Sequence, residues 1–287
     1  MAGVGEMKVL VTGSTGFIGR HVINELLNYD CEIIATATSE EKAKRFDWYK
    51  KITCVPCDYH TLSTNFYEYF NKPDILIHLA WRGLPNYQDS FHVDENLPVN
   101  SKFLKNFIDH NISKMVVVGT CYEYGLQNGC LSEDCCTEPI TQYGLAKDTL
   151  RRYLELYLNG KSTSFNWARL FFLYGEGQNP NSLLPQLERA IQEGAKEFCM
   201  SGGEQLRDYL SVEKIAQNIC KMAFQTDVEG IVNCCSGEPI SIRKLVEDYL
   251  VEHNADIPLN LGFYPYSENE PMAFWGNIDK LIQVKKE

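Results

Sequence analysis

The chain has 287 residues, of which 44% are hydrophobic and 23% charged, and its formal net charge is −11 at pH 7. A chain of this length can bury a large core, and these ordinary fractions exclude long disordered stretches. The negative charge argues against nucleic acid as the main partner, because binding a phosphate backbone requires a net basic face. No apolar run is long enough to cross a bilayer, so no membrane partner is expected.

Eleven cysteines invite a disulfide interpretation, but other features argue against it. Their number is odd, the chain is long, and no secretory signal precedes the first expected strand. The adjacent pairs Cys135–Cys136 and Cys234–Cys235 lack the spacing and the histidines of a zinc site, so no metal is expected. We therefore expect a cytoplasmic protein with reduced thiols.

Short apolar runs alternate with amphipathic stretches through the first part of the chain. Strands are expected at 8–12, 32–36, 52–55, 74–78, 114–118 and 165–171, with helices at 17–28, 40–46 and 91–110 and one carrying Tyr143. This alternation predicts an α/β fold in which helices cover both faces of a Rossmann-type, doubly wound parallel sheet.

The pattern changes after Tyr174, where 175–181 forms a turn-rich junction. Helices are expected at 183–193, 212–224 and 242–253, an apolar run occupies 230–234, and the tail is expected to be irregular. We predict a nucleotide-binding domain over 1–174, with a return segment near 206–236, and a smaller, mainly substrate-binding C-terminal lobe over 175–287. The ligand is expected in the cleft between them.

A glycine-rich turn follows the first expected strand. Gly13, Gly16 and Gly19 lie between that strand and a helix, so the backbone can approach a pyrophosphate and the helix N-terminus can offer N–H groups. The motif predicts a dinucleotide cofactor, with a plain tight turn as the alternative.

The end of the second expected strand bears on the choice of cofactor. NAD enzymes usually carry an acidic residue there, whereas this chain has hydroxyls followed by cations, including Ser39 and Lys42. These residues favour NADP(H) over NAD(H). The neighbouring Glu40 and Glu41 leave open that the cations belong to a solvated helix face.

A second motif, in the middle of the chain, predicts redox chemistry. Tyr143 and Lys147 are four residues apart and share one face of a helix. The pKa of a free phenol is near 10, and an ammonium group beside it favours the phenolate. Thr120 follows the fifth expected strand, at the ligand-binding edge of such a sheet. We predict that Thr120, Tyr143 and Lys147 are catalytic, with Tyr143 exchanging a proton with a substrate oxygen.

These motifs resemble the extended short-chain dehydrogenase/reductases, a family of nucleotide-sugar epimerases, dehydratases and reductases, over nearly the whole chain. The resemblance implies NAD(P) binding and a nucleotide-diphosphate sugar as substrate. The implied cofactor-binding residues are Gly13, Thr15, Gly16, Phe17, Ile18, Ser39, Lys42, Asp58, Tyr59, Leu79, Ala80, Trp81, Tyr143 and Lys147. The implied substrate-binding residues are Thr120, Tyr122, Asn181 and Arg207, with Arg207 at the diphosphate. The alternative for Arg207 is a salt bridge with Asp208 or another neighbour.

Two departures from the family pattern narrow the expected activity. Cys121 and Tyr122 replace the Asp-Glu pair of the sugar 4,6-dehydratases, which argues against elimination of water. Phe172 stands where many relatives have an asparagine that touches the nucleotide, which makes Asn181 a candidate replacement.

The resemblance is strongest to the deoxysugar reductases of the family. It implies NAD(P)H-dependent reduction of the 4-keto group of a nucleotide-activated 4-keto-6-deoxyhexose, such as dTDP-4-keto-6-deoxyglucose to dTDP-fucose, for surface polysaccharide including O-antigen. A 4-epimerase with tightly bound NAD is the alternative, because the same residues serve both reactions. A silent redox sensor is disfavoured by the intact Thr120, Tyr143 and Lys147. By family analogy we also expect a homodimer.

Overall fold

The computed structural model describes residues 7–268 and 270–284. Within them the large sheet has seven strands in the order β11-β7-β5-β4-β1-β2-β3, and every neighbouring pair is parallel. The strands are β1 (Lys8–Thr12), β2 (Glu32–Thr36), β3 (Thr53–Cys54), β4 (Ile75–His78), β5 (Lys114–Thr120), β7 (Ser164–Leu170) and β11 (Gly230–Cys234). The predicted Rossmann-type fold is confirmed.

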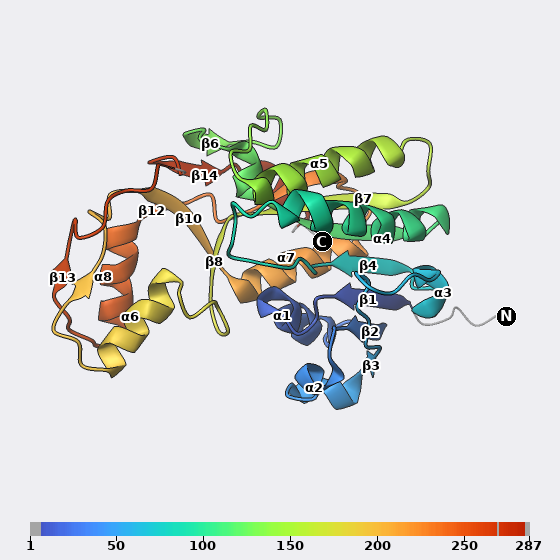
Figure 1. Ribbon diagram of the computed structural model, residues 1–287, viewed down its shortest axis with the longest axis horizontal. Helices are drawn as coiled ribbons and strands as arrows, with labels where there is room; N and C mark the ends of the chain where they lie inside the picture. The colour runs from blue at the N-terminus through green and yellow to red at the C-terminus, as the bar shows by residue number, and fades with distance from the viewer. Residues whose placement is uncertain (1–6, 269, 285–287) are drawn as a thin grey trace.

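Helices cover both faces of this sheet (Figure 1). On one face lie α1 (Phe17–Leu26), α7 (Val212–Phe224) and α9 (Asp279–Val284), and on the other α3 (Phe66–Tyr69), α4 (Leu97–Asp109) and α5 (Gln142–Tyr157). Strand β1 shows the reason. Val9 and Val11 pack in the core beneath α1, α7 and α9, and Leu10 packs in the core on the opposite face. Alternate side chains of a strand point to opposite faces, so an unbroken apolar strand needs a cover on both.

Two of the expected helices differ in the structure. The helix expected at 91–110 begins with a π-helical turn, η2 (His92–Asn96), before α4. The helix expected at 40–46 is only α2 (Glu40–Ala43), followed by the 3₁₀ turn η1 (Asp47–Lys51). Phe46 and Trp48 stack there with ring centroids 5.1 Å apart, and Trp48 is buried. The helix thus ends before this aromatic pair, and the buried Trp48 ring belongs to the 3₁₀ turn.

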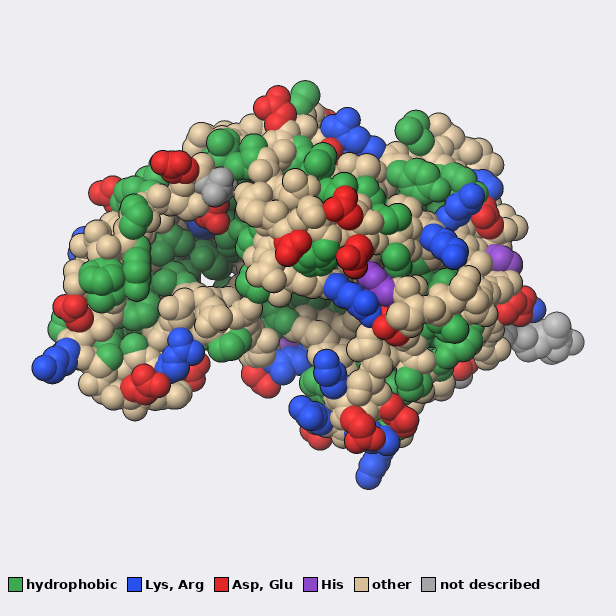
Figure 2. All heavy atoms as spheres, in the orientation of Figure 1, with side chains coloured by type: hydrophobic (Ala, Val, Ile, Leu, Met, Phe, Trp, Pro, Cys, Tyr) green, Lys and Arg blue, Asp and Glu red, His purple; other side chains and the backbone are tan. Residues whose placement is uncertain are grey.

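The smaller lobe contains β8 (Phe172–Tyr174), β10 (Leu206–Ser211) and β12 (Pro239–Ser241) in one small sheet. Helices α6 (Leu183–Gln192) and α8 (Ile242–Glu252) pack around Leu187 and Val246, and β9 (Phe198–Cys199) pairs with β13 (Leu259–Asn260). A hollow with hydrophobic side chains on its wall separates this lobe from the main body (Figure 2).

The expectation of an irregular tail is wrong for the last part of the chain. Strand β14 (Phe274–Gly276) pairs in parallel with β6 (Gly129–Leu131), and α9 packs against β11 and α7. Phe274 is buried in the cluster that also contains Phe171. These pairings join segments that are distant in sequence, so no local sequence pattern predicts them. Through β11 and α7 the later part of the chain also returns to the large sheet.

None of the helices in the described parts of the chain is both long and apolar enough to span a membrane.

Candidate active site

The glycine-rich turn lies at the carboxyl ends of β1 and β4, where the strand order reverses. Gly13 has φ +68°, and a Cβ on it would lie 2.9 Å from the backbone nitrogen of Ala80. A Cβ on Gly19 would lie 2.1 Å from the carbonyl oxygen of Gly13. Only glycine therefore allows β1, the turn and α1 to approach this closely, at the position where open α/β sheets bind ligands.

The N-terminus of α1 has the properties of an anion site. Gly16 is its N-cap, no side chain within the described residues caps it, and its first turn carries no acidic residue. Its backbone N–H groups and positive dipole end are thus available to a phosphate. This arrangement fits the pyrophosphate of a dinucleotide.

One cavity of about 710 Å³ joins the glycine turn to the predicted catalytic residues and to the smaller lobe. Of the predicted residues, its wall includes Gly13, Gly16, Phe17, Ile18, Leu79, Trp81, Thr120, Tyr122, Tyr143, Lys147 and Asn181. Phe172, which by the family resemblance stands where many relatives have an asparagine, lines it as well. The predicted residues Thr15, Ser39, Lys42, Asp58, Tyr59, Ala80 and Arg207 lie outside this wall. For each residue the role itself stays a prediction.

Thr120 and α5 are fixed close together. Thr120 ends β5, and Tyr143 stands in the first turn of α5, capped by the Thr141 hydroxyl, which accepts from the Gly144 N–H at 3.0 Å. A Cβ on Gly144 would lie 2.7 Å from the Tyr122 carbonyl oxygen. Both side chains line the cavity, and Thr120 lies close enough to Tyr143 to oppose the rise of its pKa. Two hydroxyls thus converge on one point of the cavity, where a substrate oxygen can be held.

Burial sets the protonation of the Tyr143–Lys147 pair. It raises the pKa of Tyr143 above its usual value, with Tyr87 and Glu123 adding to the rise and the Thr120 side chain opposing it. It lowers the pKa of Lys147 to about 7, opposed by the charge of Glu123. Burial is thus the largest influence on the pKa of both side chains. Tyr143 keeps its proton near neutral pH, as a proton donor requires.

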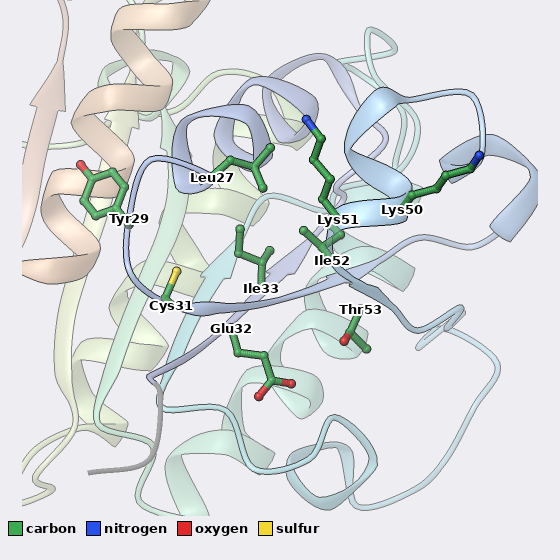
Figure 3. A pocket seen from close by; sticks show the side chains of 9 residues that line it. All are labelled: Leu27, Tyr29, Cys31, Glu32, Ile33, Lys50, Lys51, Ile52 and Thr53. Carbon is green, nitrogen blue, oxygen red and sulfur yellow. The ribbon is translucent and has the colours of Figure 1, made fainter. Parts of the chain in front are cut away.

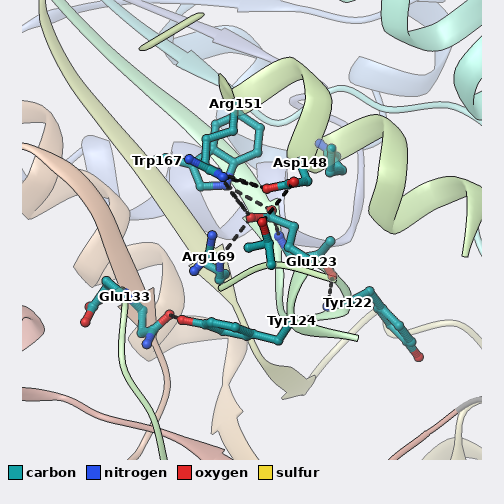
Figure 4. Close-up of polar contacts among 12 residues, drawn as sticks. Tyr122, Glu123, Tyr124, Glu133, Asp148, Arg151, Trp167 and Arg169 are labelled. Carbon is teal, nitrogen blue, oxygen red and sulfur yellow. Dashed lines mark hydrogen bonds and ion pairs between the residues drawn. The ribbon is translucent and has the colours of Figure 1, made fainter. Parts of the chain in front are cut away.

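Glu123, which sequence reasoning missed, organises the turn after β5 (Figure 4). This turn is the 3₁₀ segment η3 (Cys121–Tyr124), and the buried Glu123 carboxylate accepts from the Thr120 N–H at 2.8 Å. It also accepts from Arg169 Nε at 2.8 Å and Trp167 Nε1 at 2.9 Å. The sequence signal was available, since Thr120 and Glu123 have the spacing of a capping box.

His78, at the end of β4, is buried and has a protein partner for each ring nitrogen. Its Nδ1 lies 2.9 Å from the Thr12 hydroxyl and its Nε2 lies 2.8 Å from Asn100 Oδ1. The Asn100 oxygen can only accept, so Nε2 carries the proton. Burial lowers the pKa of His78 to about 3.

Asp58 and Tyr59, two of the predicted cofactor-binding residues that the family resemblance places at the adenine, contact other side chains of the protein. Asp58 forms an ion pair with Arg82, and this pairing lowers the pKa of Asp58. The Tyr59 hydroxyl donates to Asn100 Oδ1 at 3.1 Å. Both side chains thus have partners that an adenine would have to join or displace.

Arg207 lies on β10 and is buried, with partners from the tail. Its Nη2 lies 2.9 Å from Glu270 Oε2, and its guanidinium stacks on Phe172 and Phe274. The Tyr122 hydroxyl donates to the other Glu270 oxygen at 3.2 Å. Glu270 thereby links the smaller lobe to the turn beside Thr120.

A second cavity, of about 410 Å³, lies at the amino end of β2 (Figure 3). Its wall is formed by Leu27, Tyr29, Cys31, Glu32, Ile33, Lys50, Lys51, Ile52 and Thr53. Its wall contains none of the predicted site residues. It lies at the amino ends of the strands, whereas the glycine turn lies at their carboxyl ends.

A model of the NAD dependent epimerase/dehydratase family matches residues 9–235. The chain therefore belongs to this family and is an enzyme of the extended short-chain dehydrogenase/reductase class. This confirms the family resemblance.

Two curated relatives and one solved structure illustrate the similarity. The dTDP-6-deoxy-L-talose 4-dehydrogenase (NAD(+)) of Aggregatibacter actinomycetemcomitans is 29% identical over 272 residues, covering 94% of this chain and 99% of the relative. The dTDP-4-dehydro-6-deoxyglucose reductase of Escherichia coli is 29% identical over 264 residues, covering 83% and 79%. The fold is similar to that of a UDP-glucuronic acid 4-epimerase from Bacillus cereus, solved with UDP-glucuronic acid and NAD. The TM-score is 0.82 at 21% identity, covering 97% of this chain and 92% of that one.

Proposed function

We propose that this enzyme reduces the 4-keto group of a nucleotide-activated 4-keto-6-deoxyhexose, with dTDP-4-keto-6-deoxyglucose as the first candidate. The observation that carries the proposal is the single cavity shared by the glycine turn, Thr120, Tyr143 and Lys147. The two curated relatives support it, because both are named for chemistry at position 4 of a dTDP-linked 6-deoxy sugar. The product would be a deoxysugar, such as dTDP-fucose, for surface polysaccharide.

In the proposed mechanism the chain binds the keto oxygen and delivers a proton to it. Thr120 and Tyr143 hold the oxygen between their hydroxyls. When bound, the nicotinamide supplies the hydride that sugar C4 receives. Tyr143 donates its proton to the oxygen as negative charge develops there. The Lys147 ammonium stabilises the resulting phenolate.

We propose NADP(H) as the preferred cofactor and NAD(H) as the alternative. Lys44, the residue after α2, pairs with Glu40 and Glu41, whereas Lys42 is exposed and has no ion pair with any described residue. Lys42 and the Ser39 hydroxyl thus remain available to a 2′-phosphate. The Aggregatibacter relative, named for NAD(+), supports the alternative.

The cofactor proposal is tested with Lys42→Glu. We expect the KM for NADPH to rise about tenfold and the KM for NADH to change little, because only NADPH carries the 2′-phosphate. Lys44→Glu is the matched control. Equal effects of Lys42→Glu on both cofactors would contradict the assignment.

The reaction itself is tested by absorbance at the reduced-nicotinamide band. The protein is mixed with dTDP-4-keto-6-deoxyglucose and, in separate samples, NADPH or NADH. Stoichiometric loss of absorbance with a new sugar nucleotide supports the reductase. The alternative is a nucleotide-sugar 4-epimerase, as in the Bacillus cereus neighbour. Lack of consumption, together with NAD released on denaturation, would favour it.

We further propose a homodimer formed through α4 and α5. Leu145, Tyr153 and Leu156 of α5 are exposed, with Leu156 at 74%. A helix face with several exposed apolar side chains is suited to burial against a second copy. Leu156→Glu should lower the mass measured by light scattering to that of a monomer. Val251→Glu, at an exposed position of α8, is the control.

A further inference from the structure

Lys147 is held by an aromatic ring as well as by a carbonyl oxygen. The lysine is 2% exposed, and its Nζ donates to the Val118 carbonyl oxygen at 2.8 Å. The same Nζ lies 4.1 Å from the centroid of the Trp81 ring. The face of an indole carries negative charge density and attracts an ammonium group, most strongly away from water. Trp81 therefore interacts with the charged form of Lys147.

The Trp81 ring is in turn fixed by a histidine. The indole Nε1–H donates to His92 Nδ1 at 3.0 Å, and His92 Nε2 lies 3.0 Å from the Asn86 carbonyl oxygen. Because a carbonyl oxygen only accepts, Nε2 carries the proton and Nδ1 is free to accept from the indole. The Trp81 ring also meets the Tyr143 ring edge-on, with centroids 6.1 Å apart.

We propose that Trp81 is a positioning residue that keeps Lys147 protonated and in place beside Tyr143, with His92 fixing the indole plane. This inference rests on the proposed function, since it concerns the lysine that serves the proton donor. It assigns Trp81 a role toward another side chain, in addition to the cofactor contact that the family resemblance implies.

The other groups that face Lys147 do not replace the indole in stabilising the ammonium. Glu123 on η3 carries the opposite charge and favours the ammonium, but Arg169 and Trp167 already share its carboxylate. His78 on β4 and His92 on η2 also face Lys147, and burial lowers the pKa of both. On α5 itself the neighbouring group is Tyr143. Removing the indole would leave the ammonium with the Val118 carbonyl and the shared Glu123, so its pKa would fall further.

The first test needs no substrate and uses the full chain. Tryptophan emission is recorded across pH for the unmodified enzyme and for Trp81→Phe, and the difference isolates Trp81. We expect a pH step near pH 7 in this difference, separate from the titration of His92 below pH 6.5, and we expect Lys147→Met to abolish the step near pH 7. A difference signal without a step, or a step that persists in Lys147→Met, would overturn the proposal.

The second test is the pH profile of kcat/KM for the unmodified enzyme, Trp81→Phe and Trp81→Leu. Phenylalanine keeps a weaker aromatic face, and leucine keeps none. We expect the alkaline limb to move to lower pH in the order Trp, Phe, Leu, by about 0.5 to 1.5 pH units for leucine. Melting curves verify that each variant folds. Superimposable profiles with a uniform loss of rate would show a merely structural role and overturn the proposal.

The two tests separate this inference from the proposed function. If the emission step appears and disappears as expected while no 4-keto sugar is reduced, the proposed function fails and the Trp81–Lys147 contact stands. If the sugar is reduced but the step survives in Lys147→Met, the contact fails and the proposed function stands.

Discussion

At the residue scale, burial controls the charge of the side chains around the cavity. Tyr143 is held protonated and the pKa of Lys147 is lowered to about 7, so the pair differs from a free phenol beside a free amine. His78 is kept neutral by its place inside the sheet. Each of these side chains owes its state to desolvation, which can be tested by substitution and by pH.

Tyr143→Phe tests the proton donor. The substitution removes the hydroxyl and keeps the ring that packs against Trp81 and Tyr87. We expect turnover to fall by about 10²- to 10⁴-fold, as for loss of a general acid, with cofactor affinity nearly unchanged. Steady-state kinetics and a fluorescence titration with NADPH measure the two quantities. Tyr87→Phe is the control, and retained turnover in Tyr143→Phe would remove this residue as the donor.

The lowered pKa of His78 makes the free energy of unfolding depend on pH. Its pKa is lowered to about 3 in the folded chain, against about 6.5 when unfolded. Between these values the unfolded chain binds more protons, so the free energy of unfolding falls as pH drops below 6.5, by at most about 1.4 kcal/mol per pH unit from this group. His78→Asn should make the slope shallower in urea unfolding at pH 7, 6 and 5. The exposed His253→Asn should not, and equal slopes in all three proteins would contradict the prediction.

At the element scale, the site depends on how β5, η3 and α5 are joined. The Glu123 carboxylate closes the turn after β5 and pairs with the buried Arg169 of β7. The close approach of Gly144 to the Tyr122 carbonyl then sets α5 against this turn. The distance between Thr120 and Tyr143 is therefore a property of three elements together.

Glu123→Gln tests whether the Glu123 carboxylate holds the turn after β5 against Arg169 of β7. It removes a fully buried charge and leaves the Arg169 guanidinium without its counter-ion, so we expect the free energy of unfolding to fall by about 3 to 5 kcal/mol. Glu155→Gln is the matched control, because Glu155 pairs with Arg151 near the surface and should cost less than about 1 kcal/mol. Urea unfolding measures both. Equal losses in the two variants would contradict the role of Glu123.

At the scale of the whole molecule, the tail connects the smaller lobe to the sheet. Arg207 on β10 and Tyr122 on η3 both contact the carboxylate of Glu270. If Arg207 binds a diphosphate, that anion must compete with Glu270 for the same guanidinium. The affinity for a sugar nucleotide is then a balance between two anions.

Paired substitutions measure this balance. We expect Arg207→Ala to weaken sugar-nucleotide binding by about 10- to 100-fold, because it removes charge-assisted hydrogen bonds. We expect Glu270→Gln to tighten binding several-fold, because it removes the competing anion. Isothermal titration with a dTDP-sugar measures both dissociation constants. Unchanged affinity in Arg207→Ala would exclude its diphosphate role, and weaker binding in Glu270→Gln would show that Glu270 itself contacts the ligand.

The sequence by itself determined the features that depend on neighbours along the chain. The parallel sheet follows from apolar strands alternating with amphipathic helices, and the glycine turn and the Tyr143–Lys147 face follow from fixed spacings on one turn and one helix. Only the tertiary structure decided which distant residues meet. Glu270 lies 63 residues from Arg207, β14 pairs with β6, and the Trp81 ring lies under the Lys147 ammonium. Spacing along a chain fixes periodicity, whereas burial and pairing between distant segments depend on the packed molecule.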